Sequence, residues 1–213
     1  MKLKYIYAAI MAVIIGVTLS SCGRENDWDY DHSLENEFFF GPKEWGYEST
    51  KLGSNNVLTY SVIEGQTVAV PMHLWSEFVR SFNVETFYYT TPKPADEKYY
   101  PTPEVNKTQV AYDGTVLTRG VDYEVVDANG NVLQPNSDGA FAMSWPNAKK
   151  GDQNIYIKAL PGCKKGCFNL ETFNPNSDVT LSNLDPESTY QVRTKDYSVR
   201  IFTQNHRVTI AII

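Results

Sequence analysis

The sequence predicts an all-β sandwich, and three observations predict it. After about residue 34, no stretch of useful length places apolar residues at helical spacing. Many short runs instead alternate apolar and polar residues, and Gly, Pro, Asn and Asp separate these runs. Several runs have one wholly apolar face. Two sheets that face each other would bury all of those faces, which is the arrangement of a sandwich.

The chain begins with the pattern of a secretory signal peptide. Lys2 and Lys4 precede an uncharged apolar run from Tyr5 to Val17, which is too short to span a bilayer stably. The next residues, Leu-Ser-Ser-Cys, resemble the bacterial lipobox. This resemblance implies that residues 1–21 are removed and that the thiol of Cys22 is acylated. Cys22 is therefore the predicted lipidation site, and a membrane is the expected partner of its lipid.

An acidic, flexible tether is predicted over residues 22–36. Asp27, Asp29 and Asp31 alternate with aromatic residues, which is similar to the export signal of surface lipoproteins in gut-dwelling Gram-negative anaerobes. That resemblance implies an outer-membrane protein that faces the cell surface. Calcium binding by the three Asp residues is the alternative, but a two-residue spacing without a Gly turn would set them along a line.

The charge of the mature chain excludes one class of partner. Removal of residues 1–21 takes away Lys2 and Lys4 and no acid, so the formal net charge goes from −6 to −8. The basic residues are scattered, with Lys149-Lys150 and Lys164-Lys165 as the only doublets. Nucleic-acid-binding proteins gather Lys and Arg to displace counterions from phosphate. We therefore expect no nucleic acid partner.

Short strands fill the predicted domain, which spans residues 37–213. The expected strands are 38–40, 57–62, 67–74, 81–90, 108–112, 122–126, 131–133, 140–145, 154–160, 190–193, 197–202 and 207–213. In four of them alternation gathers the apolar residues on one face. These sets are Val68, Val70, Met72 and Leu74; Ile155, Ile157 and Ala159; Tyr197, Val199 and Ile201; and Val208, Ile210 and Ile212.

A Pro-rich surface loop is predicted over residues 91–107, because its prolines cannot donate hydrogen bonds to a sheet. Tyr99 and Tyr100 lie between these prolines and have less reason than strand residues to enter the core. Together with Trp45 they are the candidate ligand surface, with flat rings that suit a sugar or a protein partner. Packing of the tyrosines onto the edge of the sandwich is the alternative.

Two cysteines remain after Cys22 is assigned to the lipid. Cys163 and Cys167 lie four residues apart in a Gly- and Lys-rich turn, which favours a local disulfide in an envelope compartment. Free thiols, or half of a metal site, are the alternatives. Zinc needs about four ligands, and neither His32, His73 nor His206 keeps ligand spacing with the pair.

The order of several short motifs resembles a Calx-beta domain. The motifs are Glu64-Gly65 before an alternating strand, Gly120-Val121-Asp122-Tyr123, a Gly-led strand to Trp145, Gly151-Asp152, and Ile155-Tyr156-Ile157. Together with the strands expected near the C-terminus, these motifs cover residues 57–213. Calx-beta domains are Greek-key sandwiches, so the resemblance implies an immunoglobulin-like fold.

Neither a metal nor a cofactor is expected. Some Calx-beta domains bind Ca²⁺, and Glu64 matches one acid of that site, but Lys164 and Lys165 stand where the second acidic run is needed. Two calcium-like loops remain as alternatives. Asp127–Asn131 is also a hairpin turn through its Asn-Gly step, and Asn174–Asp178 is followed by Val179, where such a loop needs Gly.

A non-catalytic binding or accessory module is the function that the sequence favours. It contains no nucleophile elbow, metalloprotease helix or phosphate loop. The signal, tether and modest β-domain are similar in layout to accessory lipoproteins of outer-membrane glycan-uptake systems. The expected partners are thus a glycan or an outer-membrane protein complex. A structural spacer and a glycoside-active enzyme with a distant carboxylate pair are the alternatives.

Overall fold

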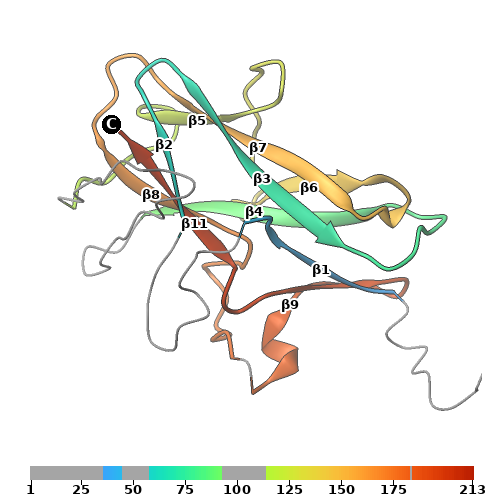
Figure 1. The fold of residues 1–213 in the computed structure, drawn as a ribbon. Coiled ribbons are helices and arrows are strands. Elements are labelled where there is room, and N and C mark those ends of the chain that lie inside the picture. Colours follow the sequence, from blue (N-terminus) through green and yellow to red (C-terminus); the bar gives the residue numbers. More distant parts are fainter. Residues whose placement is uncertain (1–35, 45–57, 93–113, 183) are drawn as a thin grey trace, which may run out of the picture. The chain divides into compact units, whose positions relative to one another are not determined.

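The computed structural model describes residues 36–44, 58–92, 114–182 and 184–213. Asn36–Ile213 forms one compact unit (Figure 1). Its described part contains eleven strands in two sheets and two short 3₁₀ turns, η2 (Pro146–Ala148) and η3 (Pro186–Thr189). No helix among the described residues is both long enough and apolar enough to cross a membrane.

The first sheet has six strands. Their order across the sheet is β5 (Tyr123–Val126), β7 (Gly151–Ala159), β3 (Thr67–Trp75), β1 (Glu37–Pro42), β10 (Ser198–Ile201) and β9 (Tyr190–Arg193). The second sheet has five, in the order β2 (Thr59–Val62), β11 (Arg207–Ile212), β8 (Gly166–Glu171), β4 (Val84–Pro92) and β6 (Phe141–Trp145).

The strand order is that of an immunoglobulin-like sandwich, which confirms the predicted all-β fold. In such folds strands A, B, E and D form one sheet and G, F and C the other. Here β1, β3, β7 and β5 are successive neighbours in the first sheet, and β11, β8 and β4 are successive neighbours in the second sheet. The additional strands β9 and β10 come between β8 and β11 in the chain, and β10 pairs in parallel with β1.

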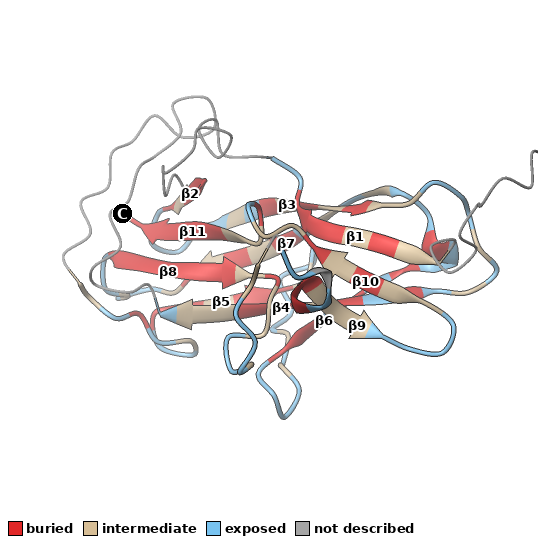
Figure 2. Ribbon diagram, turned by 90° about the horizontal axis from the view of Figure 1, so that it is seen from below, coloured by how far each residue is buried: buried red, intermediate tan, exposed pale blue. Residues whose placement is uncertain are grey.

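The core lies between the sheets and follows the predicted alternation. Val70, Met72 and Leu74 of β3 are completely buried, and the apolar sets of β7, β10 and β11 face the same interior. Figure 2 shows buried and partly exposed residues alternating along β1 and β10. Each fully buried side chain of this size stabilises the fold by about 1.5–3 kcal/mol.

Strand β8 corrects the sequence prediction, which placed a turn there and no strand. Gly166–Glu171 is the middle strand of the second sheet and pairs with both β11 and β4. A larger residue at position 166 would crowd the start of this strand, because a Cβ atom there would lie 3.1 Å from the carbonyl oxygen of Thr115. The lysines and glycines just before this strand have the composition of a turn, so the sequence pattern did not predict a strand here.

Smaller differences concern strand ends. Residues 91 and 92 belong to β4 and not to the predicted loop, and the expected strand at 131–133 is only a bridge between Val126 and Val132. The rest of the loop (93–107) and the expected strand at 108–112 lie outside the described residues.

Candidate ligand-binding face

Four of the predicted site residues lie outside the described part of the chain. They are Cys22, Trp45, Tyr99 and Tyr100. The lipidation site and the ligand surface inferred from the sequence therefore stay predictions.

Cys163 and Cys167, the predicted disulfide pair, have different surroundings. Cys163 lies in the turn after β7, where its N–H donates to the carbonyl of Leu160 over 3.2 Å, and its side chain packs against the core. Cys167 is buried in β8. Both are thiols in the structure, and burial, followed by the charge of Glu64, raises the pKa of Cys163. The disulfide stays a prediction.

Two of the calcium-like positions have their oxygens occupied by the protein. Asp127 Oδ1 accepts from the N–H groups of Asn129 and Asn131 over 2.8 and 2.9 Å, and Oδ2 accepts from the Asn131 side chain. Glu64 Oε1 accepts from the N–H of Gly162 over 2.5 Å. Within the described residues, no group of three or more His, Cys, Asp and Glu side chains is placed to hold a metal ion.

Asp122, in the Gly-Val-Asp-Tyr motif, organises two turns. Its carboxylate is buried and accepts from the N–H of Thr118 over 2.8 Å and from the N–H of Lys164 over 3.0 Å. Burial alone would raise the pKa of Asp122, but these two donors and the charge of Lys164 outweigh it and hold the pKa below its usual range. The role of this motif is therefore structural.

The outer face of the first sheet carries a row of large side chains across four neighbouring strands. The register places Phe39 of β1 beside Trp75 of β3 and Arg200 of β10, and Arg200 beside Tyr190 of β9. All four are partly exposed, since they alternate with residues that face the core. We call Tyr190, Phe39, Trp75 and the nearby Phe202 the aromatic face.

Phe202 follows β10 and joins the row. Its ring stacks on Phe39, with centroids 5.0 Å apart and planes 16° apart, and meets the Trp75 ring edge-on at 5.0 Å. Gly41 lies against these rings, since a Cβ atom there would be at an ordinary contact distance of 3.9 Å from both the Phe202 and the Trp75 rings, but only 3.0 Å from the Asn205 carbonyl oxygen. Aromatic pairs of this kind contribute about 0.5–1.5 kcal/mol beyond their buried area.

Arg200 is fixed in the middle of the row. Its Nη1 lies 3.0 Å from Glu37 Oε1, and its Nε donates to Thr189 Oγ1 over 2.7 Å. The guanidinium carbon lies 5.5 Å from the ring centre of Phe39 and 5.3 Å from that of Tyr190. Glu37 is only 8% exposed and also accepts from the Tyr190 hydroxyl over 2.8 Å. Arg200 therefore presents its charge in one orientation.

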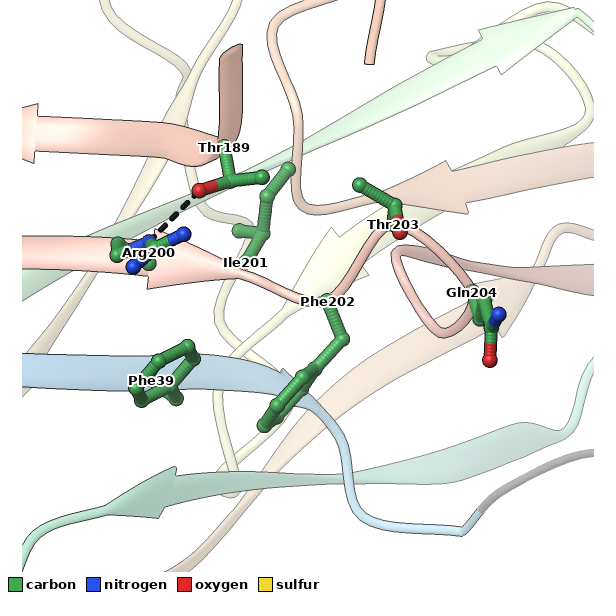
Figure 3. Close-up of a pocket in the computed structure, with 7 residues that line it drawn as sticks. All are labelled: Phe39, Thr189, Arg200, Ile201, Phe202, Thr203 and Gln204. Atoms are coloured by element: carbon green, nitrogen blue, oxygen red, sulfur yellow. Dashed lines mark hydrogen bonds between the residues drawn. The ribbon is translucent and has the colours of Figure 1, made fainter. Parts of the chain in front are cut away.

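An open pocket of about 270 Å³ lies beside Arg200. Figure 3 shows the rings of Phe39 and Phe202 side by side on one flank of this pocket. The lining residues are Phe39, Thr189, Arg200, Ile201, Phe202, Thr203 and Gln204. Its volume is just below the roughly 300–1,000 Å³ of drug-sized ligand sites, so it suits one small ring of a longer ligand.

Polar groups border the other side of the aromatic face. His73 Nδ1 and Asp152 Oδ1 are 2.5 Å apart, and Lys43 Nζ donates to Asp152 Oδ2 over 2.7 Å. The His73 ring lies 4.5 Å from that of Trp75. The hydrogen bond from Lys43, followed by that from His73, lowers the pKa of Asp152. The same bond to Asp152 raises the pKa of Lys43.

The sequence analysis missed this face. The signal for three of its residues is local, since Phe39 alternates with the core residues Phe38 and Phe40, and His73 and Trp75 alternate with Leu74. No local signal places Tyr190 and Phe202 beside them, because that depends on the pairing of β10 with β1.

Comparison with known proteins gives no family. No family model and no curated protein matches the chain. One chain of the complex between a CaDoc0917 variant and CaCohA2 is 11% identical, with a TM-score of 0.34 over 83% of this chain and 99% of its own. A family 123 glycoside hydrolase from Clostridium perfringens is 10% identical, with a TM-score of 0.30 over 83% of this chain and 27% of its own. AvmM, which catalyses macrocyclization in alchivemycin A biosynthesis, is 7% identical with a TM-score of 0.26, over 71% and 82% of the two chains. Likenesses this low carry no functional argument.

Proposed function

We propose that this is a lipid-anchored, non-catalytic protein of the cell envelope that binds a glycan through its aromatic face. The observation that carries the proposal is the row of partly exposed rings across four strands, with Arg200 held in one orientation among them. Sugar rings have flat apolar faces that stack on aromatic rings, while their hydroxyl groups take hydrogen bonds.

The surroundings of the rings support a polar, ring-shaped ligand. Thr203 and Gln204 border the pocket next to Arg200, and His73, Asp152 and Lys43 border the opposite side of the face. A ligand lying across the strands would thus meet rings along its length and hydrogen-bonding groups at both ends.

Anchoring completes the proposal. The lipobox resemblance at residues 19–22 and the acidic tether support attachment to the outer membrane through acylated Cys22, with the domain at the cell surface. The layout also favours an accessory role beside an outer-membrane glycan-uptake complex. Replacement of Cys22 by Ser should abolish incorporation of labelled palmitate and move the protein from the detergent phase to the aqueous phase.

Affinity electrophoresis through gels that contain single polysaccharides tests the binding. We expect at least one glycan to retard the wild type, and Trp75→Ala and Phe202→Ala to weaken that binding about tenfold or more, which is about 1.4 kcal/mol. Tyr156→Ala is the matched control, since Tyr156 is partly exposed on the same sheet but lies on β7 away from the aromatic face.

Other outcomes of the same gels would redirect the proposal. Loss of retardation in Tyr99→Ala and Tyr100→Ala, but not in Trp75→Ala, would move the binding surface to the Pro-rich segment. Migration of the wild type unchanged across a broad panel would contradict glycan binding and favour a structural subunit.

A further inference from the structure

Three connections meet at the end of the sandwich where the described chain begins. They are the β3–β4 loop (76–83), the β6–β7 connection (146–150) and the β9–β10 turn (194–197). Leu74 of β3 is paired with Gly151 of β7, and Glu37 of β1 is paired with Ser198 of β10, so the three connections lie at the same end of the sandwich. Arg80 Nε in the first of them donates to Asn36 Oδ1 over 2.9 Å. We call this the tether end.

Two adjacent apolar side chains project from the tether end. Phe78 is 56% exposed and Val79 is 64% exposed. Single exposed apolar residues are common on protein surfaces. A neighbouring pair at the tip of one loop, next to the point where the chain leaves the sandwich, is a more specific feature.

The loop that carries this pair is held in place on both sides. Ser76 Oγ donates to the carbonyl of Phe78 over 2.8 Å, and the N–H of Arg80 donates to the carbonyl of Asn147 over 2.7 Å. Asn147 in turn donates its N–H to Asn83 Oδ1 over 3.0 Å. Burying Phe78 or Val79 in the sandwich would break these bonds, so both side chains stay in solvent unless another surface covers them.

Basic residues outnumber acids in the three connections of the tether end. The three connections contain Arg80, Lys149, Lys150 and Lys195 against Glu77 and Asp196, so four cations meet two acids and the local formal charge is +2. The chain as a whole carries −6. The guanidinium carbon of Arg80 lies 5.3 Å from the centre of the Phe78 ring. Exposed apolar residues together with an excess of cations are typical of a segment that lies in a lipid interface beside phosphate headgroups.

The length of the tether keeps this end near a bilayer. Cys22 and Asn36 are separated by 36 minus 22, or 14, residue steps, which span at most about 50 Å when fully extended. An acylated Cys22 would therefore keep the tether end within about 50 Å of the membrane surface.

We propose that the tether end rests on the membrane surface, with Phe78 and Val79 entering the lipid interface and Arg80, Lys149 and Lys150 facing the headgroups. The proposal rests on the lipid anchor proposed above. It adds a second contact with the membrane to that anchor.

The test uses the full-length acylated protein in vesicles of phosphatidylethanolamine and phosphatidylglycerol. An environment-sensitive NBD fluorophore is attached to Phe78→Cys in a Cys163→Ser background, in which Cys167 is buried. The control places the same probe at Val121→Cys. Val121 is similarly exposed, at 62%, but lies in the turn beside Leu160 at the opposite end of β7.

We expect the fluorescence of the probe at position 78 to rise several-fold on vesicles and to be quenched by doxyl-labelled lipid, and the probe at 121 to behave as in water. Equal signals at the two positions, or a rise at 78 without lipid quenching, would overturn the membrane contact while leaving the anchor intact. Protein that does not float with the vesicles would overturn both.

Discussion

At the scale of single residues, Asp122 has the clearest energetic role. One buried carboxylate satisfies two backbone donors, and these belong to turns that are 42 and 4 residues away in sequence. Hydrogen bonds to a charged group are worth about 1.5–3 kcal/mol each, and a buried donor left without its acceptor costs a similar amount. The turn after β7 and the turn before β5 therefore depend on the same side chain.

Replacement of Asp122 by Asn should lower the free energy of unfolding by about 1–3 kcal/mol. The amide keeps one acceptor oxygen but turns an NH₂ group toward one of the two backbone donors. Urea denaturation measures the change. Asp138→Asn is the control, since Asp138 is exposed and accepts only a 3.4 Å bond from Ser137 Oγ, so its effect should stay within about 0.5 kcal/mol. Similar losses in both variants would contradict this role of Asp122.

Residue-scale alternation also explains how much of the candidate site was predictable. The core positions of β3, β7, β10 and β11 follow from a period of two, and the same period exposes Phe39, His73 and Trp75 on the other face. The alternation specifies the face of each residue but not its neighbours on that face.

At the scale of elements, the β9–β10 segment creates the candidate site. It extends the first sheet beyond β1 and brings Tyr190, Arg200 and Phe202 beside Phe39. Gln191 further ties this segment to the second sheet through bonds to the backbone of Phe87 and to the carbonyl of Thr172. The segment is thus attached on both sheets.

The contact between Glu37 and Arg200 should attach this segment to β1. Glu37 is nearly buried and Arg200 is mostly so, hence a double-mutant cycle with Glu37→Gln and Arg200→Gln should give a coupling of about 1–2 kcal/mol in the free energy of unfolding. Glu187 and Arg193 are the matched pair in the same segment. They lie 2.6 Å apart but are 66% and 54% exposed, so their cycle should show no measurable coupling. Equal coupling in the two cycles would contradict the attachment.

Element pairing sets the limit of prediction from sequence. The intervals of β9, β10 and β11 were expected nearly as found, yet nothing in their residues indicates that β10 lies parallel to β1, more than 150 positions earlier. β8 was missed for a different reason. Its apolar residues Phe168 and Leu170 lie two positions apart, on either side of Asn169, which is the spacing of a strand. The Gly- and Lys-rich turn just before them gives this part of the sequence the composition of a loop.

At the scale of the whole molecule, the apolar core and the polar ties respond to different conditions. The core consists of side chains that are uncharged at acidic and neutral pH, so its contribution changes little over that range. Asp122, Asp127 and the Asp152–Lys43 pair are ties whose pKa values are shifted by their partners. The pH dependence of stability therefore reports on them and not on the sandwich core.

Stability should fall on both sides of a broad plateau. The folded-state pKa values of Asp122 and Asp152 lie below the ordinary value of 3.8, so their contribution is complete above about pH 4 to 5 and is lost as the pH falls through those lowered values. The pKa of Lys43 lies above 10.5, so its contribution is complete below that value and is lost as the pH rises beyond it.

Urea midpoints between pH 2 and pH 7 should thus drop more steeply below about pH 4 for the wild type than for Asp122→Asn or Asp152→Asn. Trp75→Ala, which removes no titrating group, should shift the curve without changing its slope. Parallel acid limbs for the wild type and both Asn variants would mean that the pKa of neither carboxylate is lower in the folded chain than in the unfolded chain, and that the hydrogen bonds assigned to them do not stabilise the fold.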